Sequence, residues 1–323
     1  MEQSGAPHGS GLLSKLSDAV HQRIVGQDAA VEGLLVGLLT GGHVLLEGLP
    51  GLAKTLMVRT LAEAIHTSFR RIQFTPDLLP TDIVGTPIFD PASGSFRVQR
   101  GPIFSNIVLA DEINRAPPKV QAALLEAMEE RQVTIAGESY ELDRPFMVLA
   151  TQNPVELHGT YPLAEAQLDR FALKIEIAHP SREEEKAIVS RVGKGRPGPI
   201  EPVATVEEIA AAGEAAADVL LRDEVLDYLV ELAFATREPE RYGLDDLARL
   251  IEFGTSPRAT IFLARAVRAR AYLRGRDYVL PDDVKAMAPS VLRHRLKTTY
   301  EADAQGVDAA EVLRRVLGAV PAP

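Results

Sequence analysis

Five short apolar runs alternate with stretches of helical periodicity over residues 43–177, and this alternation constrains the fold more than any other feature. The runs are HVLLE at 43–47, FRRIQF at 69–74, NIVLAD at 106–111, FMVLAT at 146–151 and ALKIEI at 172–177. Helical patterns at 54–65 and 118–130 separate some of them. Such alternation is typical of a parallel sheet with helices on both faces, which binds ligands at the carboxyl ends of its strands. The sequence therefore predicts an α/β core.

Two segments interrupt this alternation, and each is predicted to form a hairpin inserted in the core. The first lies near 77–104, is rich in Pro and Gly, and contains the turn PASGS. The second lies near 132–146 and contains QVTIAGESYEL, with its turn at 136–138. Gly-containing turns between short β-prone runs are the usual signal for a hairpin.

After Pro180 the pattern changes to helices alone. Ser181 with Glu184 has the spacing of a capping box, in which two side chains satisfy backbone N–H groups at a helix start. Two further pairs have this or a closely related spacing: Thr205 with Glu208, and Asp308 with Glu311. We therefore predict two domains, an αβα core over residues 1–180 and a smaller all-helical domain over residues 181–323.

The turn between the first apolar run and the helix at 54–65 has the sequence EGLPGLAKTL. It follows the phosphate-loop pattern G-x-x-x-x-G-K-[ST], except that Ala53 replaces the second glycine. In a strand–loop–helix context, phosphates bind backbone N–H groups at the helix N-terminus. Lys54 would neutralise the β and γ phosphates and Thr55 would complete a Mg²⁺ shell, and the alanine adds only one methyl group; the alternative is a glycine-rich turn without a ligand. The predicted loop residues are Gly48, Leu49, Pro50, Gly51, Leu52, Ala53, Lys54, Thr55 and Leu56.

Polar side chains follow two other apolar runs at the point where each run ends. Asp111 and Glu112 end NIVLADE, where an aspartate can hold Mg²⁺ and a glutamate can polarise a water molecule. Asn153 follows FMVLATQ, where an amide could orient that water or contact the γ phosphate. The alternatives are a helix-capping acidic pair and an Asx turn before Pro154.

Two arginines are the remaining candidates for contact with phosphate. Arg170 lies in EAQLDRF, where a surface ion pair with Asp169 is the alternative. Arg258 follows Ser256, the expected cap, and Pro257, and therefore falls in the first turn of a predicted helix. Because the helix macrodipole disfavours a cation there, we expect an anion near Arg258.

Composition excludes several classes of function. The formal net charge of −10 argues against general affinity for nucleic acid, which Lys and Arg side chains provide. The chain has no cysteine, so it has neither disulfides nor thiolate metal ligands, and its seven histidines are scattered. The N-terminal sequence lacks the features of a signal peptide, and no apolar run is long enough for a membrane span. These features predict a soluble, cytoplasmic protein.

Five motifs follow one another along the chain: GLPGLAKT, VLADEINRA, ATQNP, AQLDRF and SPR. In this order they resemble the motifs of an AAA+ ATPase, and their sequences are closest to those of the MoxR group. Alanine before the loop lysine is a familiar variant in that group. The resemblance continues from IVGQ at 24–27 to PDDV and VLRHRL near the C-terminus, and so covers nearly the whole chain. It implies a phosphate loop, a magnesium and base strand, a first sensor, an arginine finger and a second sensor.

Carried over to these positions, the resemblance implies particular roles. ATP and Mg²⁺ are the implied ligands, with Thr55 and Asp111 at the metal and Val25, Gly26 and Gln27 beside the adenine. Arg170 would act in trans on a neighbour's γ phosphate, which implies a ring of identical subunits, typically a hexamer. Arg258, in the helical lid, would close over the phosphates and report hydrolysis as lid motion.

The resemblance also implies a chaperone-like role: remodelling client proteins or inserting metal cofactors, beside a partner with a von Willebrand factor A domain. The two predicted hairpins are candidate contacts with the client. Two other hypotheses remain: a nucleotide-gated scaffold that barely hydrolyses ATP, and a nucleic-acid motor. The presence of Glu112 and Arg170 counts against the scaffold, and the negative net charge counts against the nucleic-acid motor.

Overall fold

A five-stranded parallel sheet forms the centre of the computed structural model, which describes residues 10–153, 159–193 and 198–323. The strand order is β2-β5-β8-β1-β9. Their bounds are β1 (Val44–Glu47), β2 (Phe69–Gln73), β5 (Ile107–Asp111), β8 (Met147–Gln152) and β9 (Leu173–Glu176). Each of the five predicted apolar runs forms one strand, and the predicted α/β fold is confirmed.

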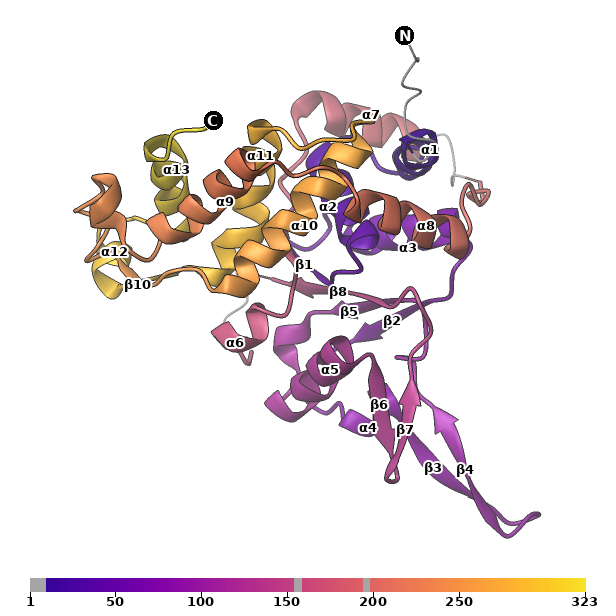
Figure 1. The fold of residues 1–323 in the computed structure, drawn as a ribbon. Helices are drawn as coiled ribbons and strands as arrows, with labels where there is room; N and C mark the ends of the chain where they lie inside the picture. Colours follow the sequence, from indigo (N-terminus) through magenta and orange to yellow (C-terminus); the bar gives the residue numbers. More distant parts are fainter. Residues whose placement is uncertain (1–9, 154–158, 194–197) are drawn as a thin grey trace.

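Alternate side chains of the strands enter two different cores, one on each face of the sheet. Leu46 and Leu149 belong to one core, whereas Leu45 and Val148 belong to the other, as the two-residue period of a strand requires. The first core is covered by α1 (Ser10–His21), α2 (Asp28–Leu39) and α3 (Lys54–Ile65). The second is covered by α4 (Pro80–Val84), η1 (Ile113–Arg115) and α5 (Pro118–Glu130). Figure 1 shows the sheet between these two layers.

Two antiparallel hairpins extend from the α5 side of the sheet (Figure 1). The first joins β3 (Gly85–Asp90) to β4 (Ser95–Arg100), and the second joins β6 (Gln132–Ile135) to β7 (Glu138–Glu141). Ala136 and Gly137 connect β6 to β7 with φ values of 53° and 88°. Two consecutive residues with positive φ are what a tight hairpin turn requires.

The part after Pro180 is helical, apart from one short antiparallel pair of strands. Its elements are α7 (Arg182–Val192), α8 (Val206–Ala217), α9 (Asp223–Ala235), η2 (Pro239–Tyr242), β10 (Ile251–Phe253), α10 (Pro257–Leu273), α11 (Pro281–Leu292), η3 (Arg293–Arg295), β11 (Lys297–Thr298), α12 (Tyr300–Ala304) and α13 (Ala309–Ala319). Strands β10 and β11 pair with each other, and they are too short to leave a periodic signal in the sequence. We keep the division near Pro180 as a proposal and call residues 181–323 the lid.

Side chains cap the lid helices at three of the predicted positions, Ser181, Thr205 and Asp308, but not at a fourth. The hydroxyl groups of Ser181 and Thr205 accept hydrogen bonds from backbone N–H groups of α7 and α8. Ser256 stands at the N-cap of α10, yet its hydroxyl has no hydrogen-bond partner among the described residues. The expected cap at Ser256 is therefore absent, and Pro257 at the first helical position starts the helix instead.

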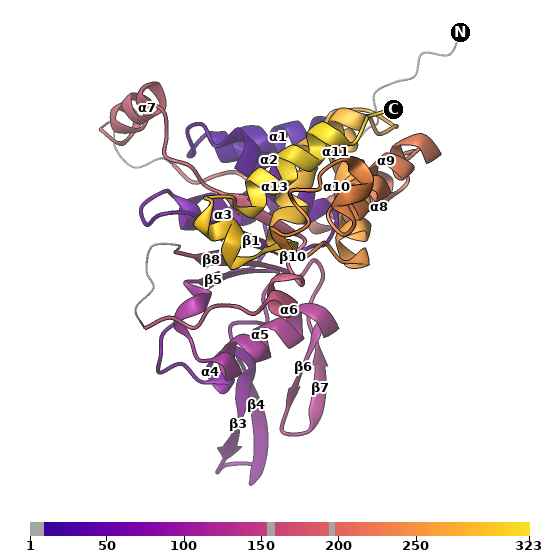
Figure 2. The same cartoon turned by 90° about the vertical axis from the view of Figure 1, so that its left-hand side faces the viewer.

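The lid packs on the helical layer of the core rather than across the carboxyl ends of the strands. Helices α8 and α10 both contact α2, and the larger of the two cores runs from α1, α2 and α3 into the lid. Figure 2 shows α10, α11 and α13 on the same side of the sheet as α1 and α2. A short helix, α6 (Glu165–Leu168), lies in the connection between β8 and β9. No helix in the described ranges is long and apolar enough to cross a membrane.

Candidate active site

The loop from Gly48 to Ala53 connects β1 to α3 at the carboxyl end of the sheet. A Cβ atom at Gly48 would lie 2.8 Å from the carbonyl oxygen of Ile177, so this position accepts only glycine. Gly51 and Ala53 have φ values of 85° and 57°. The left-handed backbone at Ala53 is what the glycine of the phosphate-loop pattern normally supplies, and a non-glycine residue there costs about 1 kcal/mol.

Lys54 is the first residue of α3, and its ammonium group points back to the loop. Its Nζ donates a hydrogen bond of 2.6 Å to the carbonyl oxygen of Gly48. Burial lowers the pKa of Lys54, while the nearby carboxylates of Asp111, Glu112 and Glu47 act in the opposite direction. The lysine thus lies within electrostatic range of Asp111 and Glu112, which the sequence assigned to the same site. Thr55 follows it in the first turn of α3.

Asp111 ends β5 and is held by side chains from both neighbouring strands. The hydroxyl of Thr151 donates to its Oδ1 over 2.5 Å and accepts from the N–H of Glu112 over 2.8 Å. The Nε and Nη2 atoms of Arg71 donate to its Oδ2 over 2.9 and 2.6 Å. Asp111 is buried, so these bonds fix its carboxylate at the carboxyl end of the sheet.

Glu112 directly follows β5 with a φ of 57°, a conformation that is strained for a non-glycine residue. Its Oε2 accepts a hydrogen bond of 2.9 Å from Nε2 of Gln73, the last residue of β2. The same oxygen lies 3.0 Å from Nε of Arg115. Backbone strain maintained by side-chain contacts is common at functional sites, and here it orients the carboxylate that the sequence assigned as a base.

Asn153 follows β8, the strand between β5 and β1 in the sheet. The preceding residue, Gln152, is the register partner of Glu47, the last residue of β1. The sheet thus brings the loop lysine, the acidic pair and the predicted sensor to one end of the molecule. The Asx turn at Pro154, the alternative considered for this segment, lies outside the described residues.

A cavity of about 790 Å³ lies beside the loop, a volume that suits a nucleotide. Its lining includes six predicted residues: Val25, Gln27, Gly51, Leu52, Ala53 and Leu56. Gly26 does not line it; its φ is 65°, and a Cβ atom there would lie 1.8 Å from a carboxylate oxygen of Glu184. The sequence did not predict the opposite wall, which comprises His179, Pro180, Glu185, Ile188, Val189 and Arg191. Lys54, Asp111 and Glu112 lie outside this cavity, past Ala53.

The two predicted arginines lie at the other end of the sheet. Arg170 precedes β9, whose first residue is the register partner of Val44 at the start of β1, so about 13 Å of strand separates it from the loop. Arg258, in the first turn of α10, lines the same cavity of about 220 Å³ as Arg170. Arg258 therefore lies at the amino end of the sheet, where α10 starts, and not beside the phosphate loop of its own chain; its contact with phosphate stays a prediction.

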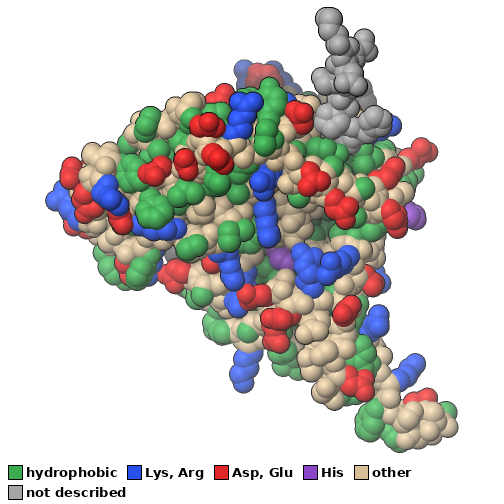
Figure 3. Space-filling model, in the orientation of Figure 1, with side chains coloured by type: hydrophobic (Ala, Val, Ile, Leu, Met, Phe, Trp, Pro, Cys, Tyr) green, Lys and Arg blue, Asp and Glu red, His purple; other side chains and the backbone are tan. Residues whose placement is uncertain are grey.

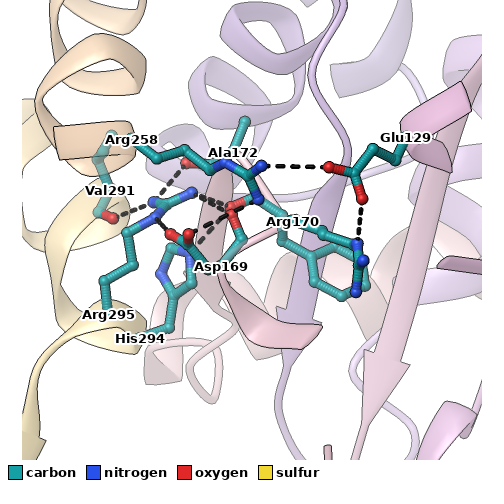
Figure 4. Close-up of polar contacts among 9 residues, drawn as sticks. Glu129, Asp169, Arg170, Ala172, Arg258, Val291, His294 and Arg295 are labelled. Carbon is teal, nitrogen blue, oxygen red and sulfur yellow. Dashed lines mark hydrogen bonds and ion pairs between the residues drawn. The ribbon is translucent and has the colours of Figure 1, made fainter. Parts of the chain in front are cut away.

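Glu129, near the end of α5, joins these arginines (Figure 4). Its Oε2 accepts from Nε of Arg170 over 2.7 Å, and its Oε1 accepts from Nη2 of Arg258 over 3.2 Å. Arg258 also lies 3.7 Å from Asp169. Carboxylates thus supply the anion that we expected near Arg258. Arg170 pairs with Glu129, whereas the alternative considered for it was an ion pair with Asp169. Hydrogen bonding by Arg170 lowers the pKa of Glu129.

Further arginines line the amino-end cavity and make this region basic. Arg131 and Arg265 line it together with Arg170 and Arg258. Figure 3 shows Lys and Arg side chains gathered where the lid helices meet the sheet. This basic region lies at the end of the sheet opposite Asp111 and Glu112.

Sequence reasoning missed several residues that the structure places in direct contact with predicted ones, among them Arg71, Gln73, Thr151 and Glu129. The first three lie at or near the ends of β2 and β8, the strands that flank β5. Polar residues near the ends of otherwise buried strands were a usable signal for them, once the strand order was known. Glu129 carried no such signal, because acidic residues near the end of a helix are common.

The fold and these residues define a phosphate-loop ATPase core with a helical lid. Residues 43–173 match the family model of the ATPase family associated with various cellular activities (AAA), and residues 246–316 match the AAA lid domain. A crystal structure described as a candidate ATPase from Cytophaga hutchinsonii superposes with a TM-score of 0.92 at 45% sequence identity, covering 98% of this chain and 96% of that chain.

Relatives of known name narrow the class further. The chain is 49% identical over 304 residues to Chaperone MoxR1 from Mycobacterium tuberculosis, covering 94% of this chain and 80% of that protein. It is 31% identical over 347 residues to Protein MoxR from Methylorubrum extorquens, covering 98% of both. The chain therefore belongs to the MoxR family of AAA+ ATPases.

Proposed function

We propose that this chain is a Mg²⁺-dependent ATPase that works as a ring of its own copies and uses ATP hydrolysis to remodel client proteins. The observation that carries the proposal is the separation of the site residues. Lys54, Asp111 and Glu112 lie at the carboxyl end of the sheet, whereas Arg170 and Arg258 lie at the amino end. A complete site then forms only where the amino end of one copy meets the carboxyl end of another.

The residues of one chain suffice to bind the nucleotide. The base would enter the cavity of about 790 Å³ between the segment at 24–27 and α7, and the phosphates would follow the loop to the start of α3. There the N–H groups of the first helical turn point outward and the macrodipole favours an anion. On nucleotide binding, Lys54 would exchange its bond to Gly48 for a phosphate oxygen.

The donor set at this end of the sheet fits Mg²⁺. Thr55 offers a hydroxyl and Asp111 a carboxylate, and no group of three or more acidic, His or Cys side chains in the described residues forms an all-protein metal cage. Mg²⁺ is usually held by one or two protein oxygens together with water and substrate phosphates. When bound, it would neutralise charge on the phosphate oxygens.

Glu112 is the proposed general base, and Asn153 the group that orients the attacking water. Gln73 and Arg115 both bind Oε2 of Glu112, so the carboxylate is directed by two side chains as well as by its strained backbone. Rigid support of this kind favours in-line attack, because phosphoryl transfer depends mainly on positioning and charge stabilisation.

Arg170 and Arg258 would act on the nucleotide of a neighbouring copy. Both guanidinium groups are partly exposed, with 31% and 45% of their side-chain surface accessible, and their ion pairs with Glu129 are therefore weak enough to exchange for a phosphate. A head-to-tail contact that repeats around a closed rotation produces a ring. Six subunits is the number that the family resemblance implies.

Two observations support the client-remodelling part of the proposal: an exposed aromatic pair on the β3–β4 hairpin, and the word chaperone in the name of the relative Chaperone MoxR1. Phe89 and Phe96 face each other across the β3–β4 hairpin in an edge-to-face contact, with ring centroids 5.3 Å apart and exposed fractions of 51% and 71%. Exposed aromatic pairs on a protruding hairpin suit transient contact with unfolded or apolar segments. A partner with a von Willebrand factor A domain is proposed from the family resemblance alone.

Two variants test the enzymatic part. We expect Lys54→Ala to lose ATP binding, and Glu112→Gln to keep it while turnover falls by about 100-fold or more. A fluorescent ATP analogue measures binding, and phosphate release measures turnover, at a protein concentration where the chain is assembled. Wild-type turnover in Glu112→Gln would contradict the assignment of the base.

The same assays distinguish the competing hypotheses. A wild-type protein that binds ATP without releasing phosphate would be a nucleotide-gated scaffold. ATPase stimulation by DNA that disappears with added salt would indicate a nucleic-acid motor. For the proposed function we expect neither, and we expect Glu112→Gln in the presence of ATP to retain client proteins.

A further inference from the structure

A short helix of the lid, η3, inserts two side chains into the loop that carries Arg170. Only 1% of the Arg295 side chain is exposed. Its guanidinium donates to Oδ1 of Asp169 over 2.7 Å and to the carbonyl oxygens of Asp169 and Phe171 over 3.1 and 2.5 Å. It also donates to the carbonyl oxygen of Ala172 over 3.3 Å. These acceptors lie on both sides of Arg170 in the chain (Figure 4).

The neighbouring residue reinforces this attachment. Nε2 of His294 lies 2.9 Å from the carbonyl oxygen of Phe171, and because that oxygen can only accept, the ring nitrogen donates. Burial holds the pKa of His294 well below its ordinary value, with the charge of Arg295 as a further cause, so the ring is neutral. Two consecutive lid side chains therefore bind the same backbone carbonyl, one residue after Arg170.

The rest of the lid holds the Arg295 guanidinium in turn. It donates to the carbonyl oxygen of Val291 in α11, and it lies 4.8 Å from the ring centroid of Phe262 in α10. Burial lowers the pKa of Arg295 to about 10, against the stabilising charge of Asp169, so the group stays charged at neutral pH. A planar guanidinium can satisfy this many acceptors at once, and an ammonium group cannot.

By contrast, within the described part of the chain the Arg170 side chain is held by a single partly exposed ion pair, with Glu129. Such a pair contributes little to a fixed geometry. The direction in which Arg170 leaves the chain is therefore set by the backbone at 169–172, and Arg295 holds that backbone.

We infer that Arg295 is a positioning residue for Arg170: it fixes the loop that carries the arginine finger, and so makes hydrolysis in the neighbouring copy depend on where the lid sits. The inference rests on the proposed function, in which Arg170 completes the neighbour's site. Because η3 carries this guanidinium and α10 and α11 contact it, a shift of the lid moves the finger without any change at the phosphate loop of the same chain.

A double-mutant cycle tests this role. We expect Arg295→Lys to lower kcat for ATP about 10- to 100-fold, since a displacement on the order of 1 Å in a catalytic group has effects of that size. KM and the affinity for a fluorescent ATP analogue should stay within about 3-fold, because the binding residues are at the other end of the sheet. In an Arg170→Ala background, Arg295→Lys should cause no further loss of kcat.

Arg293→Lys is the matched control. Arg293 belongs to the same short helix and is also largely buried, but it pairs with Glu176 over 2.6 Å at the far end of β9. We expect its kcat to stay within about 2-fold of wild type. Phe262→Leu is the second test variant, in case Arg295→Lys does not fold. It removes the ring beside the Arg295 guanidinium but leaves the hydrogen bonds of Arg295. It should lower kcat in the wild-type background and cause no further loss in the Arg170→Ala background.

Several results would overturn the inference while leaving the proposed ATPase intact. One is a wild-type kcat in Arg295→Lys. Another is an equal fold-loss in the wild-type and Arg170→Ala backgrounds, which would show that Arg295 supports the site by a route other than Arg170. If Arg170→Ala itself turns over like wild type, the finger role fails and the inference fails with it. Failure of the proposed function is a separate result, namely a wild-type protein that releases no phosphate.

Discussion

The two ends of the central sheet are built in different ways. At the carboxyl end, Asp111 and Asn153 stand at the ends of β5 and β8, and Lys54 begins the helix after the loop from β1, so the parallel sheet brings all three to one edge. At the amino end, Arg170 and Arg258 come from a loop and from a lid helix, and Glu129 of α5 joins them. One end is thus defined by strand ends, and the other by side chains that are distant in the sequence.

This difference assigns different properties to the two ends. The carboxyl end is rigid within one chain, because Arg71, Thr151 and Gln73 bind its acidic residues. The amino end carries partly exposed cations and is attached to the lid through Arg295. We therefore expect changes at the carboxyl end to alter nucleotide binding or the chemical step within a subunit, and changes at the amino end to alter the rate in a neighbouring subunit.

The largest expected effect is that of Arg170→Ala, which removes the proposed arginine finger from the amino end. Loss of an arginine finger lowers kcat by about 1000-fold or more, and ATP affinity should be unchanged. Mixing Arg170→Ala with Glu112→Gln subunits should restore phosphate release, because about a quarter of the interfaces in a random equal mixture then pair an intact site with an intact finger.

The matched control for this mixture replaces Glu112→Gln by the double variant Glu112→Gln/Arg170→Ala, which supplies no finger. It should restore nothing. If the first mixture stays as inactive as its two components, the arginine at the amino end does not act between subunits and the contrast between the two ends fails.

A smaller effect is the pH dependence of folding stability, which we attribute to His43, a buried residue at the amino end of the sheet. Burial lowers the pKa of His43 from 6.5 to about 4, and the charge of Arg131 acts in the same direction. The ring accepts from the N–H of Val148 and donates to the carbonyl oxygen of Met128, so it is neutral when folded. Because the unfolded chain binds the proton first, stability is complete above pH 6.5 and falls as the pH drops toward 4.

At pH 4, the titration of His43 should have lowered the free energy of unfolding by about 3 kcal/mol. Urea unfolding at several pH values between 6.5 and 4 would measure it, and His43→Gln should show a shallower dependence over that window. His294 shares the direction of shift, so part of the dependence should persist in this variant. An unchanged slope would mean that His43 is not the titrating group.

The smallest expected effect is that of Ala53→Gly in the loop at the carboxyl end. Glycine relieves the left-handed strain of Ala53 but adds freedom to the unfolded chain, so the free energy of unfolding should change by less than about 1 kcal/mol. ATP binding and turnover should stay within about 3-fold of wild type. Ala136→Gly is the matched control, because Ala136 has a φ of 53° in a hairpin turn away from the site. A large gain in turnover for Ala53→Gly alone would show that the methyl group limits the site.

A part of the fold or of the candidate site could be predicted from the sequence when its residues form one contiguous pattern. The apolar runs gave the five strands because burial on both faces leaves a continuous apolar signal. The loop and the acidic pair were identifiable because each is a contiguous motif next to a strand. The position of Arg258 beside Arg170 could not be predicted, since a motif in a lid helix carries no information about which end of the sheet the helix approaches.

The sequence by itself determined the α/β core, the nucleotide loop with its unusual Ala53, and the family of ATPases to which the chain belongs. Each of these depends on residues within one segment, whose spacing fixes their geometry. Only the tertiary structure decided that Arg170 and Arg258 share one cavity and that Arg295 of the lid holds the loop that carries Arg170. Those contacts join segments more than 80 residues apart, and the packing of the lid on α2 sets them.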